Sequence, residues 1–350
     1  MPGTTARRRA ATLRRSPRFT WSSGTPIGSV EHPESRRDMD RRFVIAGGAV
    51  ILGGGFLLGR TVGTPWAPGG RRAPVRIGLL SSSDPEEVAL ETGIQNGIRF
   101  AVEEVNNAGG VDGRPVEIRL GPPAATPDEM VAAAEYLVSQ DRVVTLFGGG
   151  NSAARRRLAQ QLGQTGGLLV YPRSYEGLEE HRSIVYLGLT PNQQMLPAVQ
   201  FSKASGGERI YLIGNHDAYS QTAARIVSEL LGSVDSSLAG LPYFCASNST
   251  LPDLEARIVE ARPDVILNTL QGAANRILFQ RLNEGRFPTG APPVVSFRLS
   301  RVDLEQIRPE WVEGTVVVGS YFETEDPQNS EFIHRYKKRF GYDQEITDAV

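Results

Sequence analysis

The feature that most constrains the fold is a repeated alternation of short apolar runs with amphipathic segments. A largely apolar run at 75–80 reads as a buried strand and precedes a segment in which Ile94, Ile98, Ala101 and Val105 recur at helical spacing. The same unit recurs with strands expected at 115–120 and 143–147, helices at 126–139 and 152–163, and further units at 209–231, 264–284 and from 294 onward. This alternation predicts an α/β fold in which parallel sheets are flanked by helices.

About ten strands are expected, which is too many for one lobe of ordinary domain size. We therefore predict a first lobe formed by 75–187 with 322–350 and a second lobe formed by 188–321, with crossovers near Gly188 and near Tyr321–Phe322. A helix is expected at 329–340, and no strand follows it to complete the first lobe. We expect that the chain is truncated at the C-terminus.

Three segments precede the folded part. Residues 1–42 are rich in arginine and proline and lack apolar periodicity, which predicts a disordered basic leader, or a start codon assigned too early with Met39 as the true start. Residues 43–63 contain an uncharged apolar run after Arg41–Arg42, which predicts an export signal or an uncleaved membrane anchor. Residues 64–74 are a proline- and glycine-rich linker. The protein is therefore expected at the periplasmic or extracellular face of the cytoplasmic membrane.

Composition and spacing exclude several classes of function. The chain has 350 residues and a net charge of −1, so there is no global reason to expect nucleic acid as a partner. Its one cysteine, Cys245, lies in an apolar run and is expected to be a small core residue, and its four histidines lie far apart. We therefore expect no metal site. No G-x-S-x-G sequence and no phosphate-binding loop is present, so an enzyme is not indicated.

A glycine-rich turn at 148–153 fits the dinucleotide fingerprint G-x-G-x-x-A. That fingerprint requires an acidic residue roughly 20 positions further on, and position 168 is leucine. A dinucleotide cofactor is therefore disfavoured, and no other cofactor is expected. Free backbone N–H groups at this helix start, with the Ser152 hydroxyl, could hold a carbonyl or carboxylate oxygen. The alternative is that Ser152 only caps the helix.

A second polar loop follows the apolar run at 168–171, which Pro172 ends. Arg173, Ser174, Tyr175 and Glu176 come next and have no helical period. In an open α/β sheet, the loops that follow the strands are where ligands bind. The alternative is a surface loop with solvated charges.

Several motifs occur in a fixed order along the chain. They are Ala101–Val111 followed by Gly113, Phe147-Gly148 with Ser152, Tyr171-Pro172 with Tyr175–Glu179, Pro191–Gln194, Pro263–Ile266 and Asn268–Leu270. With these motifs, residues 75–350 resemble the urea and short-chain amide solute-binding proteins, a branch of the leucine/isoleucine/valine-type periplasmic binding family. The tyrosine-proline-x-x-tyrosine-glutamate-glycine run is the most specific of the matches.

The resemblance implies a two-lobed type I periplasmic binding protein fold that closes around a small-molecule ligand and delivers it to the membrane subunits of an ABC permease, without catalysis. The implied ligand is urea, a short-chain amide or a related small polar or anionic solute. An alternative is an amide-type ligand sensor that regulates a partner protein. The ligand-binding residues expected from the motifs and their neighbours are Gly150, Asn151, Ser152, Tyr171, Arg173, Ser174, Tyr175, Asp217 and Thr269.

The chain departs from the family pattern at three places. Gly150 replaces an aromatic residue, Arg173 replaces a small neutral residue, and Asn215-His216-Asp217 replaces serine-aspartate-tyrosine. A buried arginine needs a partner, and we expect Glu176, Asp217 or a ligand carboxylate to provide it. These departures predict a wider and more polar cleft than a urea site, suited to a larger amide or an anionic solute.

Overall fold

The computed structural model describes residues 73–84, 87–234, 236–246, 250–288, 290–342 and 346, all of them within the unit Gly70–Val350. The expected leader at 1–42, the export signal or anchor at 43–63 and nearly all of the linker lie outside the described residues. Among the helices that are described, none combines the length and apolar character needed to cross a membrane.

The first sheet contains five parallel strands in the order β2-β1-β3-β4-β5. These strands are β1 (Val75–Leu79), β2 (Val116–Leu120), β3 (Thr145–Phe147), β4 (Leu169–Tyr171) and β5 (Ile184–Tyr186). Leu79, Leu146 and Leu169 are almost fully buried, as expected for central strands that are covered on both faces. The predicted parallel sheet is confirmed.

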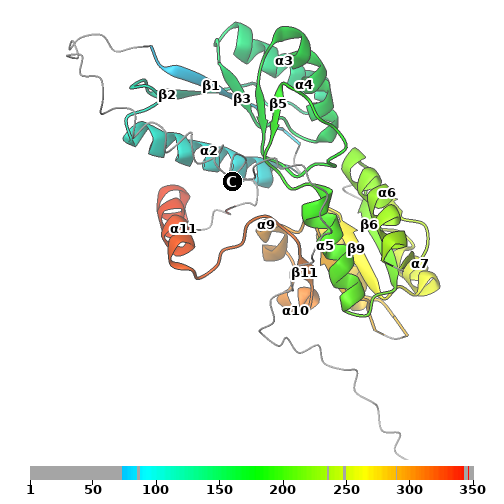
Figure 1. The fold of residues 1–350 in the computed structure, drawn as a ribbon. Coiled ribbons are helices and arrows are strands. Elements are labelled where there is room, and N and C mark those ends of the chain that lie inside the picture. Colours follow the sequence, from blue (N-terminus) through cyan, green and yellow to red (C-terminus); the bar gives the residue numbers. More distant parts are fainter. Residues whose placement is uncertain are drawn as a thin grey trace, which may run out of the picture. The chain divides into compact units, whose positions relative to one another are not determined.

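Helices cover both faces of this sheet. They are α2 (Val88–Asn107), α3 (Pro127–Ser139) and α4 (Ser152–Thr165), and Figure 1 shows α2 on the opposite side of the sheet from α3 and α4. At the start of α3, the Thr126 hydroxyl accepts from the backbone N–H of Glu129, and the Glu129 carboxylate accepts from the backbone N–H of Thr126, so the two residues form a capping box. Leu137 and Leu158 join the two helices to the core of the sheet.

The second sheet contains six strands in the order β11-β10-β9-β6-β7, with β8 paired to β6, and all the pairings are parallel. Its strands are β6 (Arg209–Asn215), β7 (Ser237–Leu238), β8 (Tyr243–Cys245), β9 (Val265–Thr269), β10 (Val294–Ser296) and β11 (Val316–Val317). Its helices are α5 (Pro191–Ala204), α6 (Ala218–Ser233), α7 (Leu254–Ala261), α8 (Ala273–Glu284), α9 (Arg301–Glu305) and α10 (Pro309–Val312). Cys245 is buried in the apolar core of this sheet, as its sequence context predicts.

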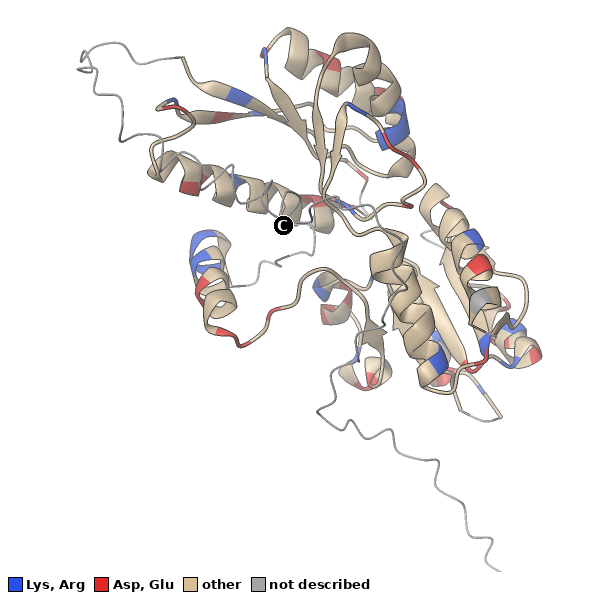
Figure 2. Ribbon diagram, viewed as in Figure 1, with Lys and Arg blue, Asp and Glu red and all other residues tan. Residues whose placement is uncertain are grey.

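The last helix of the described chain, α11 (Pro327–Phe340), packs against α2. The rings of Phe100 and Tyr336 meet edge to face with centroids 5.8 Å apart. Arg339 lies 2.6 Å from the carboxylate of Glu103, and Figure 2 shows the basic last turn of α11 to which it belongs. The segment after β11 therefore contacts a helix of the first sheet, across more than 200 residues of sequence.

Candidate functional site

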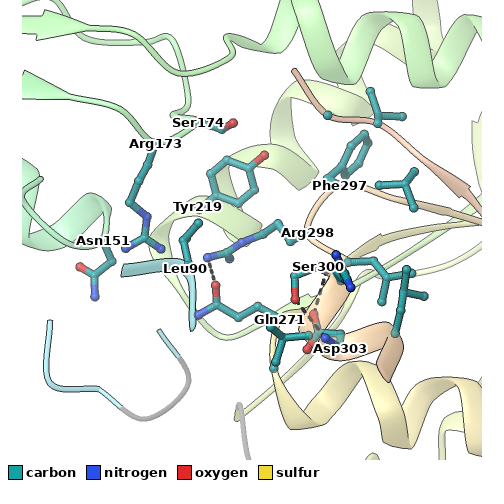
Figure 3. Close-up of a pocket in the computed structure, with 18 of the residues that line it drawn as sticks. Leu90, Asn151, Arg173, Ser174, Tyr219, Gln271, Phe297, Arg298, Ser300 and Asp303 are labelled. Atoms are coloured by element: carbon teal, nitrogen blue, oxygen red, sulfur yellow. Dashed lines mark hydrogen bonds between the residues drawn. The ribbon is translucent and has the colours of Figure 1, made fainter. Parts of the chain in front are cut away.

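A cavity of about 1220 Å³ is lined by residues that follow the strands of both sheets. Tyr171, Arg173 and Ser174 lie at the end of β4, and Asn151 and Ser152 follow β3. The second sheet contributes the segments after β6, β9, β10 and β11, including His216–Tyr219, Gln271–Ala273 and Phe297–Asp303. Figure 3 shows several of these side chains around the cavity. This is the edge at which parallel sheets bind ligands, because the loops there vary without disturbing the strands.

The structure places six of the nine predicted site residues in the cavity wall. These six are Asn151, Ser152, Tyr171, Arg173, Ser174 and Asp217, whereas Gly150, Tyr175 and Thr269 do not line it. The loop after β3, with Asn151 and Ser152, and the loop after β4, with Arg173 and Ser174, are thus brought together, although about 20 residues separate them in the chain.

The start of α4 is capped by Asn151 and not by Ser152. Asn151 Oδ1 accepts from the backbone N–H groups of Ala153 and Ala154, both at 3.1 Å. Those two N–H groups are therefore occupied by the Asn151 side chain, and of the backbone donors expected at this helix start they are not free for a ligand. The Asn151 Nδ2 amide has no hydrogen-bond partner within the described chain, and Asn151 is one of the residues of the cavity wall.

Beneath Ser152 lies a fully buried arginine, Arg155. Its Nη2 atom is 2.6 Å from Oε2 of the buried Glu176, its Nε donates to Glu179, and its Nη1 is 3.4 Å from the Ser152 hydroxyl. Burial disfavours the ionised form of Glu176, but the Arg155 charge and the hydrogen bonds outweigh it and hold the pKa of this carboxyl below its usual value. The glutamate of the Tyr-Pro-x-x-Tyr-Glu-Gly run therefore neutralises an internal cation.

Both tyrosines of that run support the same arginine. The Arg155 guanidinium lies over the rings of Tyr171 and Tyr175, at 4.9 and 5.5 Å from their centroids. Tyr175 also stacks on Tyr186 with centroids 4.4 Å apart and packs against the core, which explains why it does not line the cavity. The Tyr171 hydroxyl donates to the carbonyl oxygen of Gly150 at 3.0 Å.

Gly150 contributes to the site through its backbone. Its φ of +65° lies in the left-handed region, and a Cβ at this position would be 3.0 Å from the methyl group of Met130. The aromatic wall expected at this position in the family would therefore not fit here without movement of Met130. The carbonyl oxygen of Gly150 instead fixes the Tyr171 side chain.

Arg173 is buried and is paired with two glutamates of α2 and its N-cap. Its Nη2 atom lies 3.2 Å from Oε1 of Glu87, and its Nη1 atom lies 3.4 Å from Oε1 of Glu91. The prediction that Glu176 or Asp217 pairs with Arg173 was wrong, because Glu176 pairs with Arg155 and Asp217 pairs with Arg298. The spacing of four residues places Glu87 and Glu91 on one side of a helix start, but nothing in that spacing identifies Arg173 as their partner.

The two glutamates differ in their proton affinity. Burial raises the pKa of Glu91 to about 7, against the opposing effect of the Arg173 charge, and the neighbouring Glu87 raises it further. For Glu87, burial acts in the same direction, but the charge and hydrogen bond of Arg173 outweigh it and lower the pKa. Near neutral pH, the negative charge of Glu87 and Glu91 therefore balances the positive charge of Arg173, and the three side chains together carry no net positive charge.

The second sheet supplies a half-buried ion pair to the cavity. Asp217 caps α6 by accepting from the backbone N–H of Ser220 at 2.6 Å, and its other oxygen accepts from Arg298 at 3.0 Å. Arg298 also donates to the Gln271 side chain and lies over the ring of Tyr219, 5.0 Å from its centroid. Arg298 and Gln271 were not predicted as site residues, although Phe297-Arg298 directly follows the apolar run of β10.

Thr269 is buried at the end of β9, where its hydroxyl donates to the carbonyl oxygen of Ile213 at 3.2 Å. It therefore joins two neighbouring strands and does not line the cavity. Over the described part of the chain, no group of three or more histidine, cysteine, aspartate or glutamate side chains has an arrangement that could hold a metal ion.

Comparisons with known proteins agree with this architecture. A family model described as a periplasmic binding protein domain matches residues 75–350. A leucine-binding protein from Thermotoga maritima is 18% identical, with a TM-score of 0.68 over 79% of this chain and 78% of that one. A solute-binding protein from Rhodopseudomonas palustris in complex with 3,4-dihydroxybenzoic acid is 18% identical, with a TM-score of 0.67 over 77% and 74%. A branched-chain amino acid transporter substrate-binding protein from Streptococcus pneumoniae in complex with isoleucine is 17% identical, with a TM-score of 0.63 over 76% of this chain and 77% of that one. At these identities, the structural likeness establishes the fold.

Proposed function

The chain belongs to the periplasmic binding protein family, and on that premise we propose that it is an extracytoplasmic solute-binding protein that delivers a small polar solute to the membrane subunits of an ABC transporter. The observation that carries the proposal is the cavity of about 1220 Å³, whose wall includes loops that follow the C-terminal ends of strands in each of the two sheets. A ligand held by both walls favours the closed arrangement of the lobes, which is the state a permease would recognise. No step of this role involves catalysis.

The charges in the cavity wall favour a ligand without net charge. Two arginines of the cavity wall, Arg173 and Arg298, are already opposed by carboxylates at 3.2 and 3.0 Å. A carboxylate ligand would have to compete with these internal partners, whereas an uncharged amide would leave both ion pairs intact. This supports the amide part of the sequence-based prediction and not its anionic part.

Hydrogen-bonding groups for an amide are available in the part of the cavity wall formed by the loops of the first sheet. The Nδ2 amide of Asn151 can donate to a carbonyl oxygen, and the Ser174 hydroxyl can donate or accept. The cavity is several times larger than urea or acetamide requires, so a larger amide fills it better. Tyr219 and Phe297, in the part of the cavity wall formed by the second sheet, provide apolar surface for the remainder of such a ligand.

Isothermal titration calorimetry tests the ligand class. Urea, acetamide, propionamide and benzamide would be titrated into the purified protein, with acetate, benzoate and isoleucine at the same pH and salt concentration. The proposal expects saturable binding of at least one amide and a preference for benzamide over benzoate of about tenfold or more. Binding of benzoate or isoleucine without any amide binding would contradict it.

Export distinguishes this role from the alternative, a cytoplasmic amide sensor that regulates a partner protein. The predicted export signal or anchor at 43–63 lies outside the described residues, so the test is made on cells. Fractionation of cells that express the full chain should recover the protein outside the cytoplasm. Recovery in the cytoplasm together with amide binding would favour the sensor.

A further inference from the structure

Gln194 is a buried glutamine of α5 that lies behind the cavity wall. Its Nε2 amide donates to the carbonyl oxygens of Phe297 and Val318, at 3.2 and 3.0 Å. Its Oε1 atom accepts from the Tyr219 hydroxyl at 2.8 Å. Both N–H donors and the oxygen are thus used, so the side chain is held in one orientation.

The three partners of Gln194 come from three different parts of the second sheet, and all three line the cavity. Tyr219 is in the first turn of α6, Phe297 directly follows β10, and Val318 directly follows β11. Tyr219 in turn lies under the Arg298 guanidinium, and Figure 3 shows Tyr219, Phe297 and Arg298 on the cavity side. One buried side chain therefore connects the aromatic and cationic parts of this wall.

We propose that Gln194 is a positioning residue for ligand specificity. Its hydrogen bonds hold Tyr219, Phe297 and Val318 in place, and the positions of these three residues determine how large a ligand the cavity accepts on this side. The residue does not touch the ligand, since it does not belong to the cavity lining. The inference that it affects specificity rests on the proposed function, whereas its effect on the wall does not. No apolar residue of the same size can replace it, because the carbonyl oxygens of Phe297 and Val318 and the buried Tyr219 hydroxyl would each lose a hydrogen bond.

The first test needs no ligand. Hydrogen–deuterium exchange would be compared for the wild type, Gln194→Leu and Gln194→Glu, with Gln200→Leu as the control because Gln200 is an exposed glutamine of the same helix. We expect roughly tenfold faster exchange at 297–299 and 318–320 in Gln194→Leu, and no change in Gln200→Leu. Gln194→Glu keeps an acceptor for Tyr219 but has at most one donor, so it should affect the 297 and 318 segments more than Tyr219.

The second test measures specificity. Dissociation constants for acetamide, propionamide and benzamide would be compared between the same variants. We expect the preference between benzamide and acetamide to change by roughly tenfold in Gln194→Leu and to remain as in the wild type in Gln200→Leu. Unchanged exchange at both segments, or an equal loss of affinity for every amide, would overturn the proposal.

The two measurements separate the two inferences. If the wild type binds none of the amides, the proposed ligand class is wrong, while the exchange data still decide whether Gln194 holds the wall. If Gln194→Leu does not fold, Gln194→Glu gives the exchange result.

Discussion

Arg155 and Glu176 form an ion pair of 2.6 Å in which both side chains are almost completely buried. Arg155 is in the first turns of α4, whereas Glu176 is in the loop after β4, so the pair connects the two loops of the first sheet that line the cavity. Its position directly beneath Ser152 and Tyr171 makes it a structural support for the candidate site.

Removal of one member of this pair should destabilise the protein strongly. Arg155→Met removes the buried cation from Glu176 and leaves only the half-exposed Arg156, 3.6 Å from its other oxygen, which should lower the free energy of unfolding by about 3–5 kcal/mol. Arg157→Met is the matched control, because Arg157 is on the same helix and pairs with Asp128 at the surface, where the loss should be below about 1 kcal/mol. Urea denaturation measures both values. Equal effects of the two substitutions would contradict the buried role.

Stability should depend on pH through Glu91. Burial raises the pKa of its carboxyl from 4.5 to about 7, so the folded protein binds this proton more tightly than the unfolded chain. The resulting stabilisation is complete below about pH 4.5 and is lost as the pH rises through about 7. Between these limits, the free energy of unfolding of the wild type should fall by about 3 kcal/mol relative to Glu91→Gln.

The measurement is a series of urea denaturation curves from pH 4.5 to pH 8 for the wild type and Glu91→Gln. Glu87 does not produce this trend, because its pKa is lowered and its contribution is lost only as the pH falls. Glu104→Gln serves as an exposed control on the same helix. Parallel pH curves for the wild type and Glu91→Gln would refute the prediction.

Asn151 should have two separable roles. Asn151→Ala removes the cap of α4 and should cost about 1 kcal/mol of stability. Asn151→Asp keeps the capping oxygen but replaces the Nδ2 donor with a carboxylate oxygen, so stability should change little while the affinity for an amide weakens roughly tenfold. Thermal denaturation and calorimetric titration together test this. If Asn151→Asp binds the amide ligand as tightly as the wild type, the Nδ2 group of Asn151 does not contact the ligand.

The Asp217–Arg298 pair should control which charge the cavity accepts. Asp217→Asn keeps a good helix cap but releases Arg298, so the affinity for acetate should rise relative to acetamide, by roughly tenfold. Arg298→Met leaves Asp217 unopposed and should favour acetamidinium over acetamide by a similar factor. Calorimetric titration with the three isosteric ligands gives the ratios. If neither ratio moves, the ion pair does not face the ligand.

The sequence by itself determined the main strand–helix units and the edge of the sheets at which the site lies. Continuous apolar runs such as 210–213 in β6 indicate strands buried on both faces, and the capping box at Thr126 marks the start of α3. These signals are local, because each depends on residues within one or two turns of the chain. The loops at Asn151–Ser152 and Tyr171–Ser174 were predicted for the same reason, since they follow such runs directly.

Only the tertiary structure decided which charges are neutralised and by which partners. Arg173 meets Glu87 and Glu91 from more than 80 residues away, and Asp217 meets Arg298 from 81 residues away. An ionic interaction depends on distance in space and on the loss of solvent, and neither is encoded in local spacing. For that reason the sequence indicated that the buried arginine needs a partner, and the packing of the loops against the start of α2 supplied it.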